Sequence, residues 1–236
     1  NKRMGIVWWS GYLETNINVK IMDKIKTTHV GSLPRSKKLS EILFKKDKNE
    51  AFDQLELDKI IEEDVNKIVK KQIDIGIDII SDGEMSKISY ATYVKDRLHG
   101  FSGESERRAP KDLDDFPSYK EKIAKSGGTP TYTRPCCTAN LKIKDTKSLT
   151  KDISNLKSAL KKNNHSHGFI NSASPGVISN FLPNKFYKND DDYLQALSKI
   201  MKTEYDEITK NDLFLQIDCP DLALARHMTF KNVSDE

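Results

Sequence analysis

The sequence predicts an α/β protein built around a parallel sheet. Runs of β-prone residues alternate with stretches that carry apolar residues at helical spacing. Each β-prone run ends in a short polar turn rich in glycine, proline, serine or aspartate. The chain has 236 residues, which is long enough for one large domain with a buried core.

The elements alternate along most of the chain. In order, we predict strand 26–30, helix 53–75, strand 77–80, strand 131–141, helix 148–160, strand 167–173, helix 190–210 and strand 213–218. The segment 101–129 interrupts the pattern because it is charged and contains Pro110, Pro117 and two adjacent glycines. Residues 1–21 show no clear period, so we interpret them as an N-terminal extension. They are either not native or a short segment that packs on the domain.

The two clearest helices have recognisable ends. Helix 53–75 carries Ile61, Val65 and Ile68 at helical spacing, and Gly76 fits the position just after its last turn. Helix 190–210 starts with three aspartates, which interact favourably with the positive end of a helix dipole. Strands joined through such helices form right-handed βαβ units, and this connection makes the strands parallel.

Composition excludes several classes of protein. The chain has 39 Lys and Arg residues against 35 Asp and Glu, and the two signs are interspersed, so we expect no nucleic-acid partner. No apolar run approaches the roughly 18 residues that a membrane span needs. Three cysteines cannot form a disulfide framework, which favours a cytoplasmic location. The oligomeric state cannot be predicted.

Polar residues gather just after the predicted strands. They are Ser32, Asp82, Glu84, Arg134, Ser172, Ser174, Asp218 and Asp221. Active sites lie at the carboxyl ends of the strands both in (β/α)8 barrels and in doubly wound sheets, so periodicity alone leaves these two folds open. No phosphate loop or dinucleotide fingerprint is present, which argues against a nucleotide site.

Four of these turns resemble one known family. The segments are Thr27-Thr28-His29-Val30-Gly31-Ser32-Leu33-Pro34-Arg35, Ser81-Asp82-Gly83-Glu84-Met85, Ala173-Ser174-Pro175-Gly176 and Leu215-Gln216-Ile217-Asp218-Cys219-Pro220-Asp221. Together they resemble the C-terminal catalytic barrel of cobalamin-independent methionine synthase, and most of all its short, single-barrel members. The likeness extends from about Met22 to the end of the chain.

The resemblance implies a (β/α)8 TIM barrel that transfers a methyl group to a thiol such as homocysteine. It assigns the backbone of Val30, Gly31 and Ser32 to the substrate carboxylate, and Glu84 and Asp218 to the substrate amino group. Two carboxylates and a row of backbone N–H groups suit those partners chemically.

The resemblance also concerns the methyl donor. Arg134-Pro135-Cys136 resembles a strand that contacts the folate in the long enzymes, although the proline is an insertion. We therefore expect Arg134 and Cys136 near a donor, which is a methyltetrahydrofolate or another methylated compound. No catalytic residue is assigned.

In the family, zinc activates the thiol through ligands on strands later than the Gln-Ile-Asp strand. We therefore expect zinc ligands beyond Glu236 and none within this chain. Strand ends spaced by about 45 residues imply that 236 residues hold five or so of eight βα units. We predict that residues 22–236 form an incomplete barrel and that the natural polypeptide continues.

Structural interpretations remain open for the same residues. Ser32 fits a turn or cap, Glu84 a helix start, Asp218 an Asx turn and Arg134 an ion pair, while Asp82 favours a turn bond. Two other functions also remain open. One is a degenerate barrel that acts as a non-catalytic binding module, and the other is an enzyme that resembles uroporphyrinogen decarboxylase.

Overall fold

The computed structural model describes residues 25–105, 111–125, 132–228, 230 and 233–234, so residues 1–21 lie outside the described part. The α-helices are α1 (Lys37–Asp47), α2 (Gln54–Asp74), α3 (Pro117–Lys125), α4 (Lys147–Lys162), α5 (Pro175–Phe181), α6 (Asp190–Lys210) and α7 (Asp221–Met228). The strands are β1 (Ile80–Ser81), β2 (Leu98–Ser102), β3 (Cys136–Ile143), β4 (Gly168–Ala173) and β5 (Phe214–Asp218). Two 3₁₀ turns cover Tyr93–Asp96 and Lys111–Asp115.

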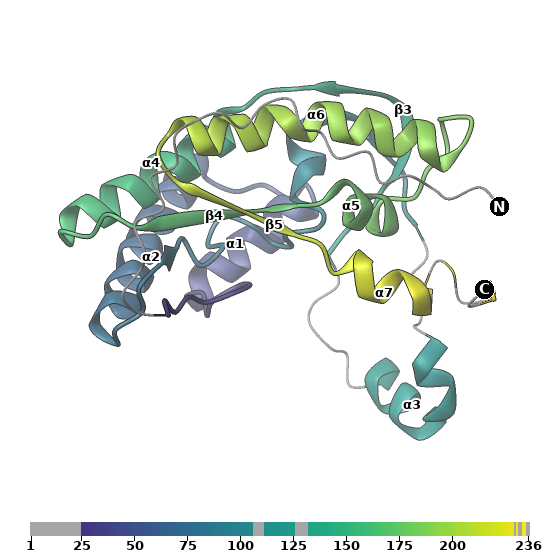
Figure 1. Cartoon of the computed structure of the whole chain (residues 1–236), viewed down its shortest axis with the longest axis horizontal. Helices are drawn as coiled ribbons and strands as arrows, with labels where there is room; N and C mark the ends of the chain where they lie inside the picture. Colours follow the sequence, from purple (N-terminus) through teal and green to yellow (C-terminus); the bar gives the residue numbers. More distant parts are fainter. Residues whose placement is uncertain (1–24, 106–110, 126–131, 229, 231–232, 235–236) are drawn as a thin grey trace.

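A parallel sheet with the order β1-β4-β5 forms the centre of the molecule. Thr28 adds a single parallel bridge to Ile79, so the first predicted strand is present only as one pairing at the β1 edge. In Figure 1, β4 and β5 run side by side toward α5 and α7. The α/β class with a parallel sheet is therefore confirmed. Among the described residues this sheet remains open at β5 and does not close into a barrel.

The long helices begin and end where their local chemistry dictates. The Asp53 side chain accepts hydrogen bonds from the backbone of Leu55 (2.8 Å) and Glu56 (3.2 Å), which caps α2. Gly76 follows α2 with φ +83°, a conformation that glycine adopts without strain. The Asn189 side chain caps α6, because its Oδ1 accepts a hydrogen bond from the backbone N–H of Asp192 at 2.8 Å.

The prediction of a parallel strand at 131–141 is wrong. β3 pairs antiparallel with β2 and forms a two-stranded ribbon outside the parallel sheet. Its burial pattern explains the difference: Cys136, Cys137 and Leu141 are buried, whereas most of the other positions are exposed. One packed face and one solvated face are typical of an antiparallel ribbon, while a central parallel strand is buried on both sides.

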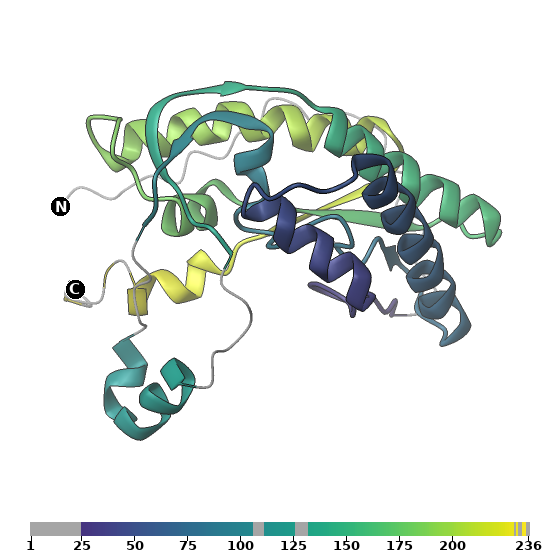
Figure 2. The same cartoon turned by 180° about the vertical axis from the view of Figure 1, so that it is seen from behind.

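Two hydrophobic clusters cover different parts of this frame. The first lies between α1, α2, α4 and the sheet, with Leu57, Leu156 and Ile170 nearly inaccessible to solvent. The second joins α5, α6 and the β2–β3 ribbon around Tyr193 and Met201. Figure 2 shows α1 and α2 on one side of the sheet and α6 along another. The sheet is thus held between helical layers, and its carboxyl edge remains for polar residues.

The interrupting segment 101–129 contains the Lys111–Asp115 turn and α3. Figures 1 and 2 place these elements apart from the sheet, beyond α7. Within the described residues, no helix is long and apolar enough to cross a membrane.

Candidate active site

Three of the residues predicted to bind substrate meet at the carboxyl edge of the sheet. The Ser32 hydroxyl donates to Glu84 Oε2, which joins the first turn to the second. The side-chain amide of Asn171, on β4, donates to Glu84 Oε1 at 2.6 Å and to Asp218 Oδ2 at 2.8 Å. Two carboxylates, one from the turn after β1 and one from the end of β5, therefore accept hydrogen bonds from one amide nitrogen.

The turn that carries Glu84 is tightly constrained. Gly83 and Glu84 both have positive φ (65° and 56°), which is unusual for a glutamate. A Cβ on Gly83 would lie 2.9 Å from Met85 Cε and 3.1 Å from Leu33 Cβ, so any larger residue would displace these side chains in addition to adopting a strained φ. The prediction of a turn bond by Asp82 is confirmed, because its Oδ1 accepts from Glu84 N at 2.9 Å.

Arg35 ties the same turn to the first strand end. Its guanidinium donates to the backbone carbonyls of Glu84 (2.7 Å) and Lys87 (2.5 Å). Burial lowers the pKa of Arg35, while the charges of Glu84 and Asp82 act in the opposite direction. The left-handed conformation of Glu84 is therefore fixed by contacts from outside the turn, and its 2% exposed side chain is aimed into the site.

Asp218 ends β5 in a comparable frame. Gln216 Nε2 donates to Asp218 Oδ1 at 3.0 Å, and the Asp218 carbonyl accepts from Ser174 N at 3.0 Å. Ser174 caps α5 and donates its hydroxyl to Asp221 Oδ1 at 2.7 Å. A Cβ on Gly176 would lie 2.1 Å from Asp221 Oδ2, which explains the glycine in the Ser-Pro-Gly turn.

Sequence reasoning missed two polar residues of the site, which are Asn171 on β4 and Lys87 in the turn after β1. Asn171 and Lys87 are 2% and 3% exposed, and Lys87 Nζ donates to the Asn171 backbone oxygen (2.8 Å) and to its Oδ1 (3.2 Å). An asparagine inside a continuous apolar strand was a usable signal, because a buried amide needs partners. Lys87 gave no such signal, since lysines are frequent throughout the sequence.

Tyr90 is a further residue that the sequence analysis did not single out. Burial raises the pKa of Tyr90 to about 12. The charge of Asp218 adds most to this effect, followed by smaller contributions from Tyr132, Glu84 and Asp221. The half-buried phenol therefore stays protonated at neutral pH and offers an O–H donor beside the carboxylates.

The predicted backbone cradle lies at the open side of the site. Gly31 has φ +82° and turns the chain between Val30, which is 71% exposed, and Ser32. Ser32 does not cap a helix, because the cap of α1 is Ser36. Its hydroxyl is instead directed to Glu84.

The two residues expected near a methyl donor have different surroundings. Arg134 lies over the rings of Phe181 (4.6 Å) and Tyr132 (5.1 Å) and donates to the Tyr132 hydroxyl at 3.0 Å. With the residues that the structure describes, it forms these ring contacts and not the ion pair considered above. Cys136 is only 1% exposed, and its thiol lies 3.8 Å from the Glu104 carbonyl oxygen.

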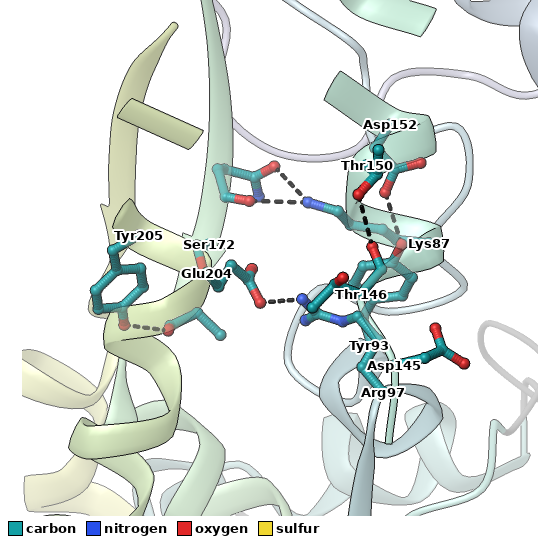
Figure 3. Close-up of polar contacts among 12 residues, drawn as sticks. Lys87, Tyr93, Arg97, Asp145, Thr146, Thr150, Asp152, Ser172, Glu204 and Tyr205 are labelled. Carbon is teal, nitrogen blue, oxygen red and sulfur yellow. Dashed lines mark hydrogen bonds and ion pairs between the residues drawn. The ribbon is translucent and has the colours of Figure 1, made fainter. Parts of the chain in front are cut away.

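A buried polar network lies behind the site (Figure 3). Tyr93 donates to Asp152 Oδ2 at 2.6 Å, and Arg97 lies over the Tyr93 ring and forms an ion pair with Glu204. Burial raises the pKa of Asp152 to about 6, and the charge of Asp82 adds to this effect. The network connects the 3₁₀ turn Tyr93–Asp96 and the adjacent Arg97 with α4 and α6.

The described residues do not fit a zinc site. Protein zinc is held by thiolate, imidazole and carboxylate groups that converge on one point. Within residues 25–105, 111–125 and 132–228, no group of three or more His, Cys, Asp or Glu residues could hold a metal ion. We therefore derive no step through zinc.

Comparisons with known proteins identify the family of the chain. The family described as "Cobalamin-independent synthase, Catalytic domain" matches residues 25–166, which is more than half of the chain. The chain belongs to this family. A comparison with curated protein sequences found no match.

Two solved structures of B12-independent methionine synthases are similar to the chain. One, from Shewanella sp. W3-18-1 in complex with selenomethionine, matches with a TM-score of 0.60 and 18% identity over 82% of this chain and 51% of that one. The other, a putative enzyme from Listeria monocytogenes, has a TM-score of 0.56 and 19% identity over 83% and 53%. The chain thus spans about half the length of these structures, and at this identity they support the fold alone.

Proposed function

We propose that the chain binds the thiol substrate in a methyltransferase of the cobalamin-independent methionine synthase type. The observation that carries this proposal is the pair of carboxylates, Glu84 and Asp218, held on one amide nitrogen at the carboxyl edge of the sheet. A substrate ammonium bound between them would gain charge-assisted hydrogen bonds in a largely buried setting, where such bonds are strong.

The remaining groups suit an amino acid that carries a thiol. The exposed turn of Val30, Gly31 and Ser32 offers backbone N–H groups to a carboxylate, as its positive-φ glycine favours. Tyr90, whose pKa is raised to about 12, would donate a hydrogen bond without losing its proton. We propose homocysteine as the acceptor, a methyltetrahydrofolate as the donor, a complete (β/α)8 barrel with zinc in the whole protein, and a cytoplasmic location.

The family match favours this proposal over a decarboxylase of uroporphyrinogen. That activity would call for arginines that face acidic side chains of a porphyrin. Arg35 binds two backbone carbonyls, and Arg134 lies over two aromatic rings.

The test is calorimetric binding of L-homocysteine and of 4-mercaptobutanoate, which lacks the amino group. Glu84→Gln and Asp218→Asn should each weaken homocysteine binding more than tenfold and change 4-mercaptobutanoate binding little, because only the ammonium contact is lost. Asp74→Asn on the exposed end of α2 is the matched control. Homocysteine binding that survives both changes would refute the assigned roles, and binding without methyl transfer by the whole protein would favour a binding module.

A further inference from the structure

Lys87 is a buried cation whose partner is unusual. Its Nζ binds two oxygens of a single neutral residue, Asn171, at 2.8 and 3.2 Å. Among the described residues, no ion pair joins Lys87 directly to a carboxylate. A buried ammonium is costly unless other charges compensate for it. Asp152 interacts electrostatically with Lys87, whose Nζ also lies 5.5 Å from the centre of the Tyr93 ring. On the amide side, Asn171 connects the ammonium to the carboxylates of Glu84 and Asp218.

The Asn171 amide can take only one orientation here. Its oxygen accepts from Lys87, and its nitrogen donates to Glu84 and Asp218. A flipped amide would place its NH₂ against the ammonium and its oxygen against two carboxylates, so three favourable contacts would become repulsive. The amide dipole thus lies between a cation at its oxygen end and two anions at its nitrogen end.

The charges around this amide explain why two carboxylates can remain close together. Glu84 and Asp218 repel each other when both are ionised, and Glu84 is almost completely buried. Lys87 supplies a positive charge behind the amide, and Arg35 supplies another on the side of the Glu84 turn. A bound ammonium would add a positive charge on the open side, between the two carboxylates.

We propose that Lys87 and Asn171 are positioning residues that hold the carboxylates of Glu84 and Asp218 together for the substrate ammonium. This inference rests on the proposed function and deepens it, because it makes selectivity for an amino-bearing ligand depend on two residues that do not need to touch that ligand. Without Lys87, the positive charge behind the amide is lost and the Arg35 charge beside Glu84 remains, so Asn171 is held less firmly and the two carboxylates move apart. The substrate ammonium then contacts one carboxylate where the native protein offers two.

The test compares Lys87→Met and Asn171→Leu with Lys95→Met, a control that removes another lysine, one that is partly buried and paired with Asp47 on α1. Lys87→Met and Asn171→Leu should weaken L-homocysteine binding at least tenfold and 4-mercaptobutanoate binding less than twofold. Lys95→Met should change neither affinity. Equal losses for both ligands would show a merely structural role, and unchanged homocysteine binding would also overturn the proposal.

A measurement without ligand separates this proposal from the proposed function. In the native protein, the Asn171 side-chain amide protons should exchange slowly with water in NMR spectra, because both are hydrogen-bonded to carboxylates. Lys87→Met should accelerate that exchange at least tenfold, while Lys95→Met leaves it unchanged. If the native protein binds neither ligand, the proposed function fails, and the exchange rates still decide whether Lys87 positions Asn171. Unchanged exchange in Lys87→Met would overturn the positioning role.

Discussion

Replacing Glu204 with glutamine should destabilise the protein by about 3 kcal/mol, at the lower end of the roughly 3–5 kcal/mol lost when one partner of a buried ion pair is removed. Glu204 on α6 and Arg97 before β2 are each 7% exposed, so glutamine would leave the guanidinium buried without a counter-charge. The bond from the Ser172 hydroxyl (2.7 Å) survives, because the glutamine carbonyl also accepts. The Tyr93 ring, 4.4 Å from the guanidinium, offsets part of the loss.

The assay is urea unfolding followed by far-UV circular dichroism, with the free energy extrapolated to water. Arg97→Met alone should cost a similar amount, because it leaves the Glu204 carboxylate buried with only a hydroxyl partner. The double variant Arg97→Met/Glu204→Leu should cost clearly less than the sum of the single changes. A loss below about 1 kcal/mol for Glu204→Gln, or additive losses in the cycle, would refute the conclusion that this pair is desolvated and coupled.

Three further changes test other parts of the structure. Burial raises the pKa of Asp152 from 3.8 to about 6, so its folded form holds a proton more tightly than its unfolded form. This carboxyl should therefore remove about 3 kcal/mol of stability as the pH rises from about 3 to about 7, through both pKa values. In urea titrations at several pH values, the free energy of unfolding of Asp152→Asn should not show that loss. If the native protein and the variant lost stability in parallel as the pH rises, the assignment to Asp152 would be contradicted. Gly176→Ala should push Asp221 off the Ser174 hydroxyl and cost about 1 kcal/mol in the same assay; no loss would mean that the helix start adapts. Arg35→Lys replaces the planar fork that reaches two carbonyls, so homocysteine affinity should fall about tenfold while the urea midpoint changes little; unchanged affinity would show that the Glu84 turn holds itself.

The sequence was sufficient for elements whose ends carry local signals. The helix predicted at 53–75 corresponds to α2, with Asp53 as its cap and Gly76 just beyond it, and helix 190–210 matches α6. β4 and β5 also lie within their predicted ranges. In these elements the apolar period and the terminal residues agree, which is the condition under which local sequence determines structure.

Elements that depend on distant partners were not predictable in the same way. β2 and the antiparallel pairing of β3 arise from contacts between residues about 40 positions apart, which no local period encodes. The short helices α5 and α7 follow directly after strand-end turns, where functional residues and a helix cap occupy the same few positions. The amino-acid composition of these turns indicated a functional site but did not indicate the short helices that follow.

The candidate site was predictable in part for the same reason. Ser32, Glu84 and Asp218 follow their strands directly, so a parallel sheet brings them to one edge. Asn171 lies within a strand, and Lys87 lies beyond a turn. Their roles depend on which face of β4 points to the site and on how the 84–87 turn folds back, and neither property can be obtained from sequence spacing alone.

The alternation along β4 has a practical consequence for any preparation of this protein. Ile170 packs among α2 and α4, the next residue, Asn171, binds the two carboxylates, and the Ser172 hydroxyl binds Glu204 on α6. A shift of the strand by one residue would exchange these environments, placing an amide in the apolar layer and an isoleucine against two carboxylates. Such a molecule would lose stability and ligand binding together. The fraction of molecules that unfolds cooperatively should therefore equal the fraction that binds ligand, so the two measured stoichiometries provide a purity check on each other.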